Sequence, residues 1–351
     1  MKTPRMSGPA VFVPASLASV IAAVAMIAAA VTTAWADPLP SWRETPSKAA
    51  ILAFVAAVST ADSPSFVPPA DRIAVFDHDG TLFPEQPASA ELLFVTSLLR
   101  ERVAAEPTLA EQPVVRALAT NDTAWMAANS TTALRQIVTL AYGNRDEAEV
   151  AAHAGSWLGR FQYPDTRRTA AGMVYQPMVE LIALLQARGF AVWLCSGNTE
   201  VFLRVIAEPL YGIPPGRVIG STFRSERRRV GDREVAWLLP GIEAFNEGET
   251  RVAAIRERIG RPPILACGNI GTGTDVAMLR ASQKDSAAAG RPSLQLLVSH
   301  DDGFRDPRYG QDDTASLTAA ADNRWTTVSV SADWARIYPD LSPSGDPPDR
   351  H

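Results

Sequence analysis

Residues 72–82 read Arg-Ile-Ala-Val-Phe-Asp-His-Asp-Gly-Thr-Leu, a short apolar run that ends in Asp77 and Asp79. Four apolar residues bounded by charge are typical of a strand that is buried on both faces of a parallel sheet. Ligands of open α/β sheets gather at the carboxyl ends of such strands, and carboxylates two residues apart can share one side of an extended chain. Gly80 permits a sharp turn there, and Thr81 adds a hydroxyl. The stretch predicts a site that binds a divalent metal and carries reactive carboxylates.

Strands and helices alternate on either side of this stretch. The pattern predicts helices over 47–58, 173–188, 200–211, 249–259 and from 274 onward, and strands over 190–195, 218–222, 263–267, 294–299 and 325–330. Residues 224–239 are expected to form a polar hairpin. Strands that alternate with helices indicate an α/β fold with a doubly wound parallel sheet, similar to a Rossmann core.

The pattern changes between residues 88 and 172, where alanine, leucine and charged residues dominate. Helical spacing recurs over 90–105, 112–128, 131–142 and 146–161, with no convincing strand between them. We therefore expect an inserted all-helical cap. The predicted segments are 37–87 (first helix and strand of the core), 88–172 (cap), 173–345 (rest of the core) and 346–351 (tail).

Residues 1–36 have the pattern of a targeting segment. Lys2 and Arg5 give a positive start, residues 11–30 are uncharged, and Ala34-Trp35-Ala36 is a small-x-small cleavage pattern. This predicts a signal peptide and a periplasmic or secreted protein. The alternative is an uncleaved anchor that tethers the protein to the inner membrane, because residues 11–30 at roughly 1.5 Å per residue can span a bilayer.

The overall charge gives no indication of a nucleic-acid partner. The formal net charge is -5 over 351 residues, and the sequence has no extended basic block. The three arginines 227–229 lie in a polar stretch, which favours a solvated hairpin over a nucleic-acid surface.

The two cysteines, Cys195 and Cys267, each close an apolar run. If their strands flank the strand before Asp77, the sulfurs lie about two strand spacings apart, roughly 10 Å. A disulfide requires Cα atoms within about 7 Å. We therefore expect two free, buried thiols that pack in the core.

Polar side chains end four of the predicted strands. These clusters are Asp77 with Asp79, then 196–199 (Ser-Gly-Asn-Thr), then Gly268-Asn269 with Asp275, and then 300–302 (His-Asp-Asp). In a parallel sheet these ends lie at one edge and can converge. A Ser-Gly turn that leads into a helix presents N–H groups and a hydroxyl, which suit a phosphate. A pocket and a surface position both remain open for residues 300–302, and we leave them out of the predicted site.

With these motifs the chain resembles the haloacid dehalogenase-like (HAD) superfamily, in its phosphatase branch. Motif one is residues 77–81, motif two is Ser196, and motif four is Gly268-Asn269 with Asp275. The long interval between motifs one and two is similar to the helical cap of phosphoserine-phosphatase-like members. The resemblance extends over nearly all of the chain after residue 36.

The resemblance implies a role for each motif. Asp77 would be the nucleophile that becomes an aspartyl phosphate, and Asp79 would protonate the leaving oxygen and activate the water. The phosphate would be bound by Thr81, Ser196, Gly197 and Arg251. A Mg²⁺ ion would be held by Asp77, the backbone carbonyl of Asp79, Asn269 and Asp275. Strand alternation is expected to point His78 away from both aspartates, as a packing residue.

Two features depart from the family pattern. The family's third motif is a lysine, but the lysines here are Lys2, Lys48 and Lys284, and none is in the right place. Arg251 stands where the lysine is expected and can bind phosphate with two N–H groups. The alternative is that it only caps a helix surface. The second departure is residues 268–275, which read as a lengthened, glycine-rich motif four with less carboxylate charge. We therefore expect an altered rate and weak metal binding.

The sequence thus favours a Mg²⁺-dependent phosphomonoester hydrolase. Its substrate would be a small phosphorylated metabolite, with phosphoserine as the nearest analogue. The alternative is a catalytically weakened module that binds phosphorylated ligands, because the lysine is missing and motif four is stretched. A dehalogenase is disfavoured, since that reaction has no leaving oxygen for Asp79 to protonate.

Overall fold

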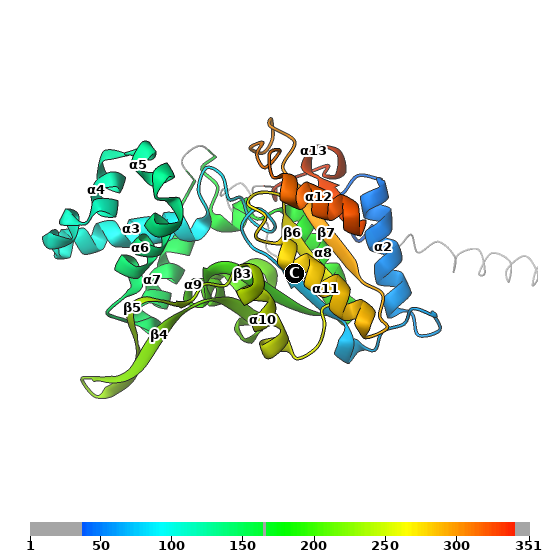
Figure 1. Ribbon diagram of the computed structural model, residues 1–351, viewed down its shortest axis with the longest axis horizontal. Helices are drawn as coiled ribbons and strands as arrows, with labels where there is room; N and C mark the ends of the chain where they lie inside the picture. The colour runs from blue at the N-terminus through cyan, green and yellow to red at the C-terminus, as the bar shows by residue number, and fades with distance from the viewer. Residues whose placement is uncertain (1–36, 164–165, 341–351) are drawn as a thin grey trace, which may run out of the picture. The chain divides into compact units, whose positions relative to one another are not determined.

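The computed structural model describes residues 37–163 and 166–340 (Figure 1). Its sheet has the strand order β2-β5-β4-β3-β1-β6-β7-β8. The parallel strands are β1 (Ile73–Phe76), β3 (Ala191–Thr199), β4 (Val218–Val230), β6 (Leu265–Asn269), β7 (Leu294–Ser299) and β8 (Thr326–Ser329). The α/β class is confirmed. The expected strand that precedes Asp77 lies at the centre, between β3 and β6.

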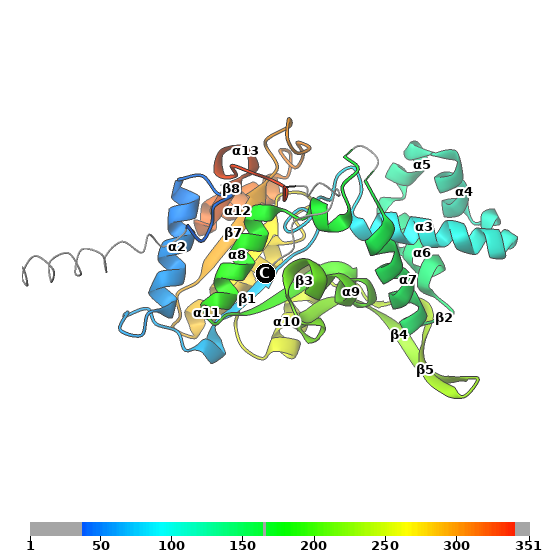
Figure 2. The same cartoon turned by 180° about the vertical axis from the view of Figure 1, so that it is seen from behind.

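Helices cover both faces of the parallel strands because β1 is apolar on both sides. Ala74 and Phe76 belong to one core cluster, and Val75 belongs to the other. The first cluster includes residues of α2 (Pro46–Ser59), α8 (Gln176–Ala187) and α9 (Glu200–Tyr211). The second includes residues of α10 (Gly248–Ile259), α11 (Val276–Ala288) and α12 (Thr314–Asn323). Figure 1 shows α11 and α12 in front of the sheet, and Figure 2, from behind, shows α8 on the other face.

The inserted segment forms the expected helices with one difference. They are α3 (Ala90–Ala105), α4 (Pro113–Thr120), α5 (Thr123–Ala128), α6 (Ser130–Tyr142) and α7 (Glu147–Arg160). The single helix expected over 112–128 is wrong, because the chain turns at Asn121, whose φ is 53°. Asp122 then caps α5 by accepting a hydrogen bond from the Trp125 amide at 2.9 Å. Asn and Asp favour such breaks over a helix interior.

The cap is not all-helical, which corrects the sequence prediction. Strand β2 (Arg145–Asp146) pairs antiparallel with β5 (Arg233–Ala244), which in turn pairs antiparallel with β4. Helices α6 and α7 also contact β5. The predicted hairpin is therefore confirmed, but it is longer than expected and joins the helices of the insertion. A two-residue strand carries no hydrophobic period, so sequence patterning could not reveal β2.

Four remaining expectations concern the N-terminal segment, the tail, the cysteines and the three arginines. The signal peptide or anchor and the 346–351 tail lie outside the described residues. Within 37–163 and 166–340, no helix has both the length and the apolar character to cross a membrane. Cys195 and Cys267 are free and buried, as expected, on the two strands that flank β1. Residues 227–229 are exposed on β4.

Candidate active site

The turn after β1 places Asp77 and Asp79 at the carboxyl edge of the sheet. The Asp77 amide donates to the Cys267 carbonyl at 2.9 Å, which extends the parallel pairing by one residue. The chain then folds back, with the Leu82 and Phe83 amides both donating to the His78 carbonyl. Gly80 has a φ of 73°, and a Cβ there would overlap the Asn269 amide. Only glycine fits this turn without displacing Asn269.

Asp77 is buried beside Arg251. Its Oδ1 lies 3.2 Å from Arg251 Nη1, but this oxygen has no hydrogen bond of good geometry among the described residues. Burial raises the pKa of Asp77 well above its ordinary value, and Asp275 raises it further, against the lowering effect of Arg251. The carboxylate is thus placed to react, and it requires more positive charge to remain ionised.

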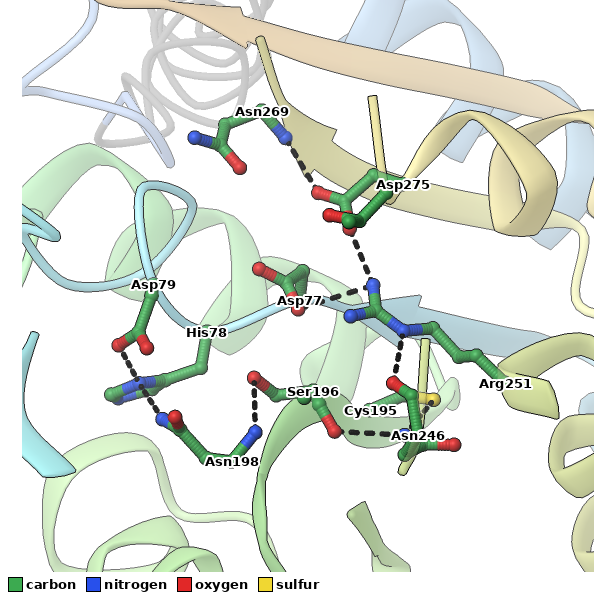
Figure 3. Close-up of polar contacts among 12 residues, drawn as sticks. Asp77, His78, Asp79, Cys195, Ser196, Asn198, Asn246, Arg251, Asn269 and Asp275 are labelled. Atoms are coloured by element: carbon green, nitrogen blue, oxygen red, sulfur yellow. Dashed lines mark hydrogen bonds and ion pairs between the residues drawn. The ribbon is translucent and has the colours of Figure 1, made fainter. Parts of the chain in front are cut away.

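Arg251 lies where the family's lysine is expected, and its guanidinium contacts two carboxylates. It projects from the first turn of α10, and Nη1 donates to Asp275 as well as approaching Asp77 (Figure 3). Its Nε donates to the Asn246 carbonyl at 3.1 Å, and Asn246 Nδ2 donates to the Ser196 carbonyl at 2.8 Å. Arg251 is only 2% exposed, so the helix-surface alternative is wrong. Burial lowers the pKa of Arg251, but the two carboxylates more than offset this.

Oxygen atoms gather opposite Arg251, around Asn269. The side-chain oxygen of Asn269 faces Asp275 Oδ2 and the backbone oxygen of Asp79, each at 3.3 Å, with no donor between them. Either rotation of the amide or a bound cation relieves this contact of three acceptors. No group of three or more His, Cys, Asp or Glu side chains that fits a metal occurs in the described part of the chain. Amide, carbonyl and carboxylate oxygens with several waters nevertheless suit Mg²⁺.

The 196–199 turn is at the end of β3, as the sequence predicts. Ser196 and Gly197 line the cavity, and Ser221 Oγ donates to the Gly197 carbonyl at 2.6 Å. Thr199 caps α9 by accepting a hydrogen bond from the Phe202 amide at 3.4 Å. Thr81, by contrast, does not line this cavity; its hydroxyl is buried and makes no hydrogen bond among the described residues. The structure brings together every predicted site residue except Thr81.

His78 does not point away from the aspartates, which corrects the sequence prediction. Its Nδ1 lies 2.8 Å from Asp79 Oδ1, and its Nε2 lies 3.1 Å from the Tyr211 hydroxyl (Figure 3 shows the Asp79 contact). The chain after Phe76 is a turn, so strand alternation does not apply there. With its proton on Nδ1, His78 donates to Asp79 and accepts from Tyr211. His78 therefore orients the Asp79 carboxyl.

His300 is also part of the support of the site, and the surface alternative is wrong for it. It is fully buried, and its Nε2 lies 2.7 Å from the Gly80 carbonyl. Because a carbonyl only accepts, Nε2 donates. The other ring nitrogen lies 2.8 Å from Asp306 Oδ2, and the Tyr338 hydroxyl donates to Asp306 Oδ1 at 2.7 Å. This chain of contacts holds the turn that carries Asp79.

Three glutamates that line the cavity were not identified as site residues from the sequence: Glu85, Glu91 and Glu247. Glu85 follows the Asp79 turn, and Asn269 Nδ2 donates to its Oε1 at 3.4 Å. Glu91 lies on α3 and accepts from Tyr142 Oη at 2.8 Å and from the Thr199 amide at 2.9 Å. Burial raises the pKa of Glu85 and that of Glu91 to about 7. One signal was available: Glu91 shares the apolar stripe of α3 with Phe94 and Leu98.

These groups surround one cavity of about 160 Å³ between the core and the cap. The core supplies the carboxylates, Arg251 and the Ser196 turn, while the cap supplies Glu91 and apolar side chains. Drug-sized ligands occupy pockets of roughly 300–1,000 Å³. A cavity of this size admits a phosphate with a compact organic group.

The family model described as haloacid dehalogenase-like hydrolase matches residues 74–280. No curated protein matches the sequence.

A conserved, functionally unknown protein from Anaerococcus prevotii DSM 20548 shares 14% identity at a TM-score of 0.54, over 80% of this chain and 91% of its own. A protein of unknown function from Bordetella pertussis Tohama I shares 16% identity at a TM-score of 0.47, over 73% of this chain and 97% of its own. A probable phosphoserine phosphatase from Vibrio cholerae shares 13% identity at a TM-score of 0.36, over 72% of this chain and 67% of its own. At 14% identity and a TM-score of 0.54, the Anaerococcus prevotii structure indicates a shared fold and no more.

Proposed function

Because the chain belongs to the haloacid dehalogenase-like hydrolases, we propose that it is a Mg²⁺-dependent phosphomonoester hydrolase that acts on a small phosphorylated metabolite. One observation carries the proposal: Arg251 contacts Asp77 and Asp275 at the floor of a cavity that the Ser196 turn also lines. A nucleophilic carboxylate, a buried cation and an N–H-rich turn are the groups that phosphoryl transfer requires.

The first half-reaction uses Asp77 and Asp79. An oxygen of the Asp77 carboxylate attacks phosphorus, the bond from phosphorus to the ester oxygen breaks, and an aspartyl phosphate forms on Asp77. Asp79 gives its proton to the departing alcohol oxygen. His78 holds the Asp79 carboxyl at 2.8 Å, which fixes its orientation toward the leaving group.

The second half-reaction releases phosphate and restores both carboxyl groups. Asp79, now a carboxylate, takes a proton from water as that water attacks phosphorus, and the bond between phosphorus and the Asp77 oxygen breaks. Arg251 balances the charge of Asp77 and Asp275 throughout, because its guanidinium is buried and stays protonated. The aspartyl phosphate thus divides one difficult displacement at phosphorus into two easier ones.

The residues around Asn269 fit a Mg²⁺ ion. Asp77, the backbone carbonyl of Asp79, Asn269 and Asp275 would hold it, since their oxygens are hard ligands and the side-chain oxygen of Asn269 faces both Asp275 Oδ2 and the Asp79 carbonyl. When bound, Mg²⁺ supplies positive charge for the phosphate oxygens. That charge also favours the ionised form of Asp77, whose pKa the protein alone raises.

Hydrolysis of an aryl phosphate by the protein beginning at residue 37 tests the proposal. We expect Mg²⁺-dependent turnover that EDTA abolishes and Asp77→Asn lowers by at least a thousandfold, because the amide is a poor nucleophile. Asp71→Asn, in a surface ion pair with Arg261, is the matched control and should keep full activity. Ordinary turnover by Asp77→Asn would refute the mechanism.

The second function to be distinguished is a module that binds phosphorylated ligands without turnover. It is favoured by the arginine in place of lysine, since Arg251 is already engaged by two carboxylates. Calorimetric titration with inorganic phosphate, with and without Mg²⁺, separates the two. Stoichiometric binding with no turnover under any divalent metal would establish the module.

We also propose that the protein is exported to the periplasm or secreted, with tethering by residues 11–30 as the alternative. The basis is the order of charge, apolar run and small residues within 1–36. Fractionation of cells that express the full chain, with immunodetection of the cleaved and uncleaved lengths, tests this. Uncleaved protein in the cytoplasm would refute both forms.

A further inference from the structure

The cavity has an excess of negative charge for a phosphate site. Among the described residues that line it, one is basic, Arg251, and five are acidic: Asp77, Asp79, Glu85, Glu91 and Glu247. The two aspartates belong to the reaction, and Glu85 lies beside the metal ligand Asn269. Glu91 and Glu247 remain, and neither the chemistry nor the metal accounts for them.

Glu247 lies directly against the phosphate-binding turn. A Cβ built on Gly197 would be 3.2 Å from Glu247 Oε1. The carboxyl is half-buried, with burial raising its pKa and Arg251 and Arg135 lowering it. Arg135 is exposed and stacks on the Phe245 ring, with its guanidinium carbon 4.7 Å from the ring centroid. It does not line the cavity. A carboxylate beside a phosphate is unfavourable unless a cation lies between or next to them.

Glu91 contacts the last residue of the same turn, Thr199. Three donors reach it, the Tyr142 hydroxyl and the amide and hydroxyl of Thr199, but no basic side chain of the described residues forms an ion pair with it. It is 4% exposed and lines the cavity. Burial raises the pKa of Glu91 to about 7 although these hydrogen bonds lower it. Above that pH Glu91 is a carboxylate and can attract a cation.

The remaining wall toward the cap is apolar. Leu92, Val138, Ile242 and Phe245 line it. No lysine or second arginine of the described lining offers a partner for a substrate carboxylate or a second phosphate. Methylene groups can pack on this wall, and an aromatic ring also attracts a cation.

We propose that the preferred substrate is the phosphate ester of a small amino alcohol, whose ammonium group is bound by Glu91 and Glu247 while its methylene groups contact the apolar wall. This inference rests on the proposed phosphatase function and names its substrate class. It excludes esters whose alcohol carries a carboxylate, because Glu91 and Glu247 repel an anion in a buried site.

Three esters of matched size test the charge alone. O-phosphoethanolamine carries an ammonium, propyl phosphate replaces it with a methyl, and phosphoglycolate ends in a carboxylate. At pH 8, above the pKa of about 7 that burial gives Glu91, we expect kcat/KM for O-phosphoethanolamine to exceed that for propyl phosphate at least tenfold. Phosphoglycolate should be the poorest of the three.

Substitutions then assign the preference to the two carboxylates. Glu247→Gln should lower the ratio of kcat/KM for O-phosphoethanolamine to that for propyl phosphate by at least threefold. Glu91→Gln should do the same, and its melting temperature shows whether it folds. Glu257→Gln, exposed on α10, is the matched control and should keep the ratio.

These outcomes distinguish a failure of the inferred substrate class from a failure of the proposed phosphatase function. Hydrolysis of propyl phosphate or phosphoglycolate as fast as O-phosphoethanolamine would overturn the substrate class and leave the phosphatase intact. Hydrolysis of the aryl phosphate but of none of the three esters would do the same. A preference that survives both glutamate substitutions would overturn the role of these carboxylates. No hydrolysis of any of the four esters would instead overturn the proposed function.

Discussion

Arg251 Nη1 lies 3.2 Å from Asp77 Oδ1, and the same nitrogen donates a hydrogen bond to Asp275. One buried cation therefore serves both the nucleophile and a carboxylate of the proposed metal site. The two acids lie on different strand ends, after β1 and after β6, so Arg251 also ties these ends together. The arrangement makes the positive charge of Arg251 a feature that the site requires.

Replacing Arg251 should separate charge from shape. We expect Arg251→Met to lower kcat/KM at least a hundredfold and to destabilise the fold by about 3–5 kcal/mol, because it leaves two buried carboxylates unpaired. Arg251→Lys should lose no more than tenfold, since it keeps the charge. Arg256→Met, exposed on the same helix, is the control. Steady-state kinetics and urea unfolding provide the measurements, and equal activity of Arg251→Met and the parent would contradict the prediction.

Adding a carboxylate at Asn269 should strengthen metal binding. Asn269→Asp places a further negative charge next to Asp275 and the Asp79 carbonyl, the groups that its side chain already faces. We expect Mg²⁺ to bind about tenfold more tightly by calorimetry, and the melting temperature in EDTA to fall because the acids repel one another. Unchanged Mg²⁺ affinity would show that Asn269 lies outside the metal site.

Glu91 should make stability depend on pH. Its pKa is raised from 4.5 to about 7 by burial, so the folded protein binds this proton more tightly than the unfolded chain does. Its contribution is therefore largest below pH 4.5 and is lost as the pH rises to 7, about 3 kcal/mol in all. Urea unfolding at pH 5 and pH 7.5 should show that Glu91→Gln loses less stability over this range than the parent. Parallel pH profiles would contradict the shift.

His300 should act on the rate through the Asp79 turn. In His300→Gln the hydrogen bond to the Gly80 carbonyl is lost or lengthened, so Asp79 is held less firmly. We expect kcat to fall about tenfold with little change in KM, because the phosphate contacts remain. His153→Gln, half-buried on α7 and outside the cavity, is the control. A rise in KM at unchanged kcat would assign His300 to substrate binding instead.

The two cysteines should react only after unfolding. Burial raises the pKa of Cys195 to about 12 and that of Cys267 well above its ordinary value, so neither is a thiolate at neutral pH. We expect no reaction with a thiol-specific dye in the native protein and two equivalents in guanidinium chloride. A fast-reacting native thiol would contradict the packing role.

Much of the fold could be predicted because it depends on local pattern. The apolar run of β1, the helix α9 and the strand β7 follow from hydrophobic period and from their polar ends. Of the strand order, only the placement of the Cys195 and Cys267 strands on either side of β1 was considered from the sequence, and the structure has it. The pairing of β2 with β5 joins residues about 90 positions apart, and no local pattern encodes it.

The site divides in the same way. Asp77, Asp79, Ser196, Arg251, Asn269 and Asp275 were predicted from motifs, and the structure brings all six together. The prediction for His78 was wrong because it assumed an extended chain where the backbone turns. His300 and Glu91 could not be placed, since their partners, the Gly80 carbonyl and the Thr199 amide, lie far away in the sequence.

The sequence alone determined the family, the sheet and the reactive pair, because these depend on a short apolar strand and on carboxylates two residues apart. Only the tertiary structure decided how that pair is held: Arg251 beside Asp77, His78 on Asp79, and His300 beneath the turn. It alone also placed Glu91 of the cap and Glu247 of the core on one cavity. Such contacts join residues that are remote in the sequence. Their distances and their burial determine charge and pKa, and the order of the residues alone does not give either.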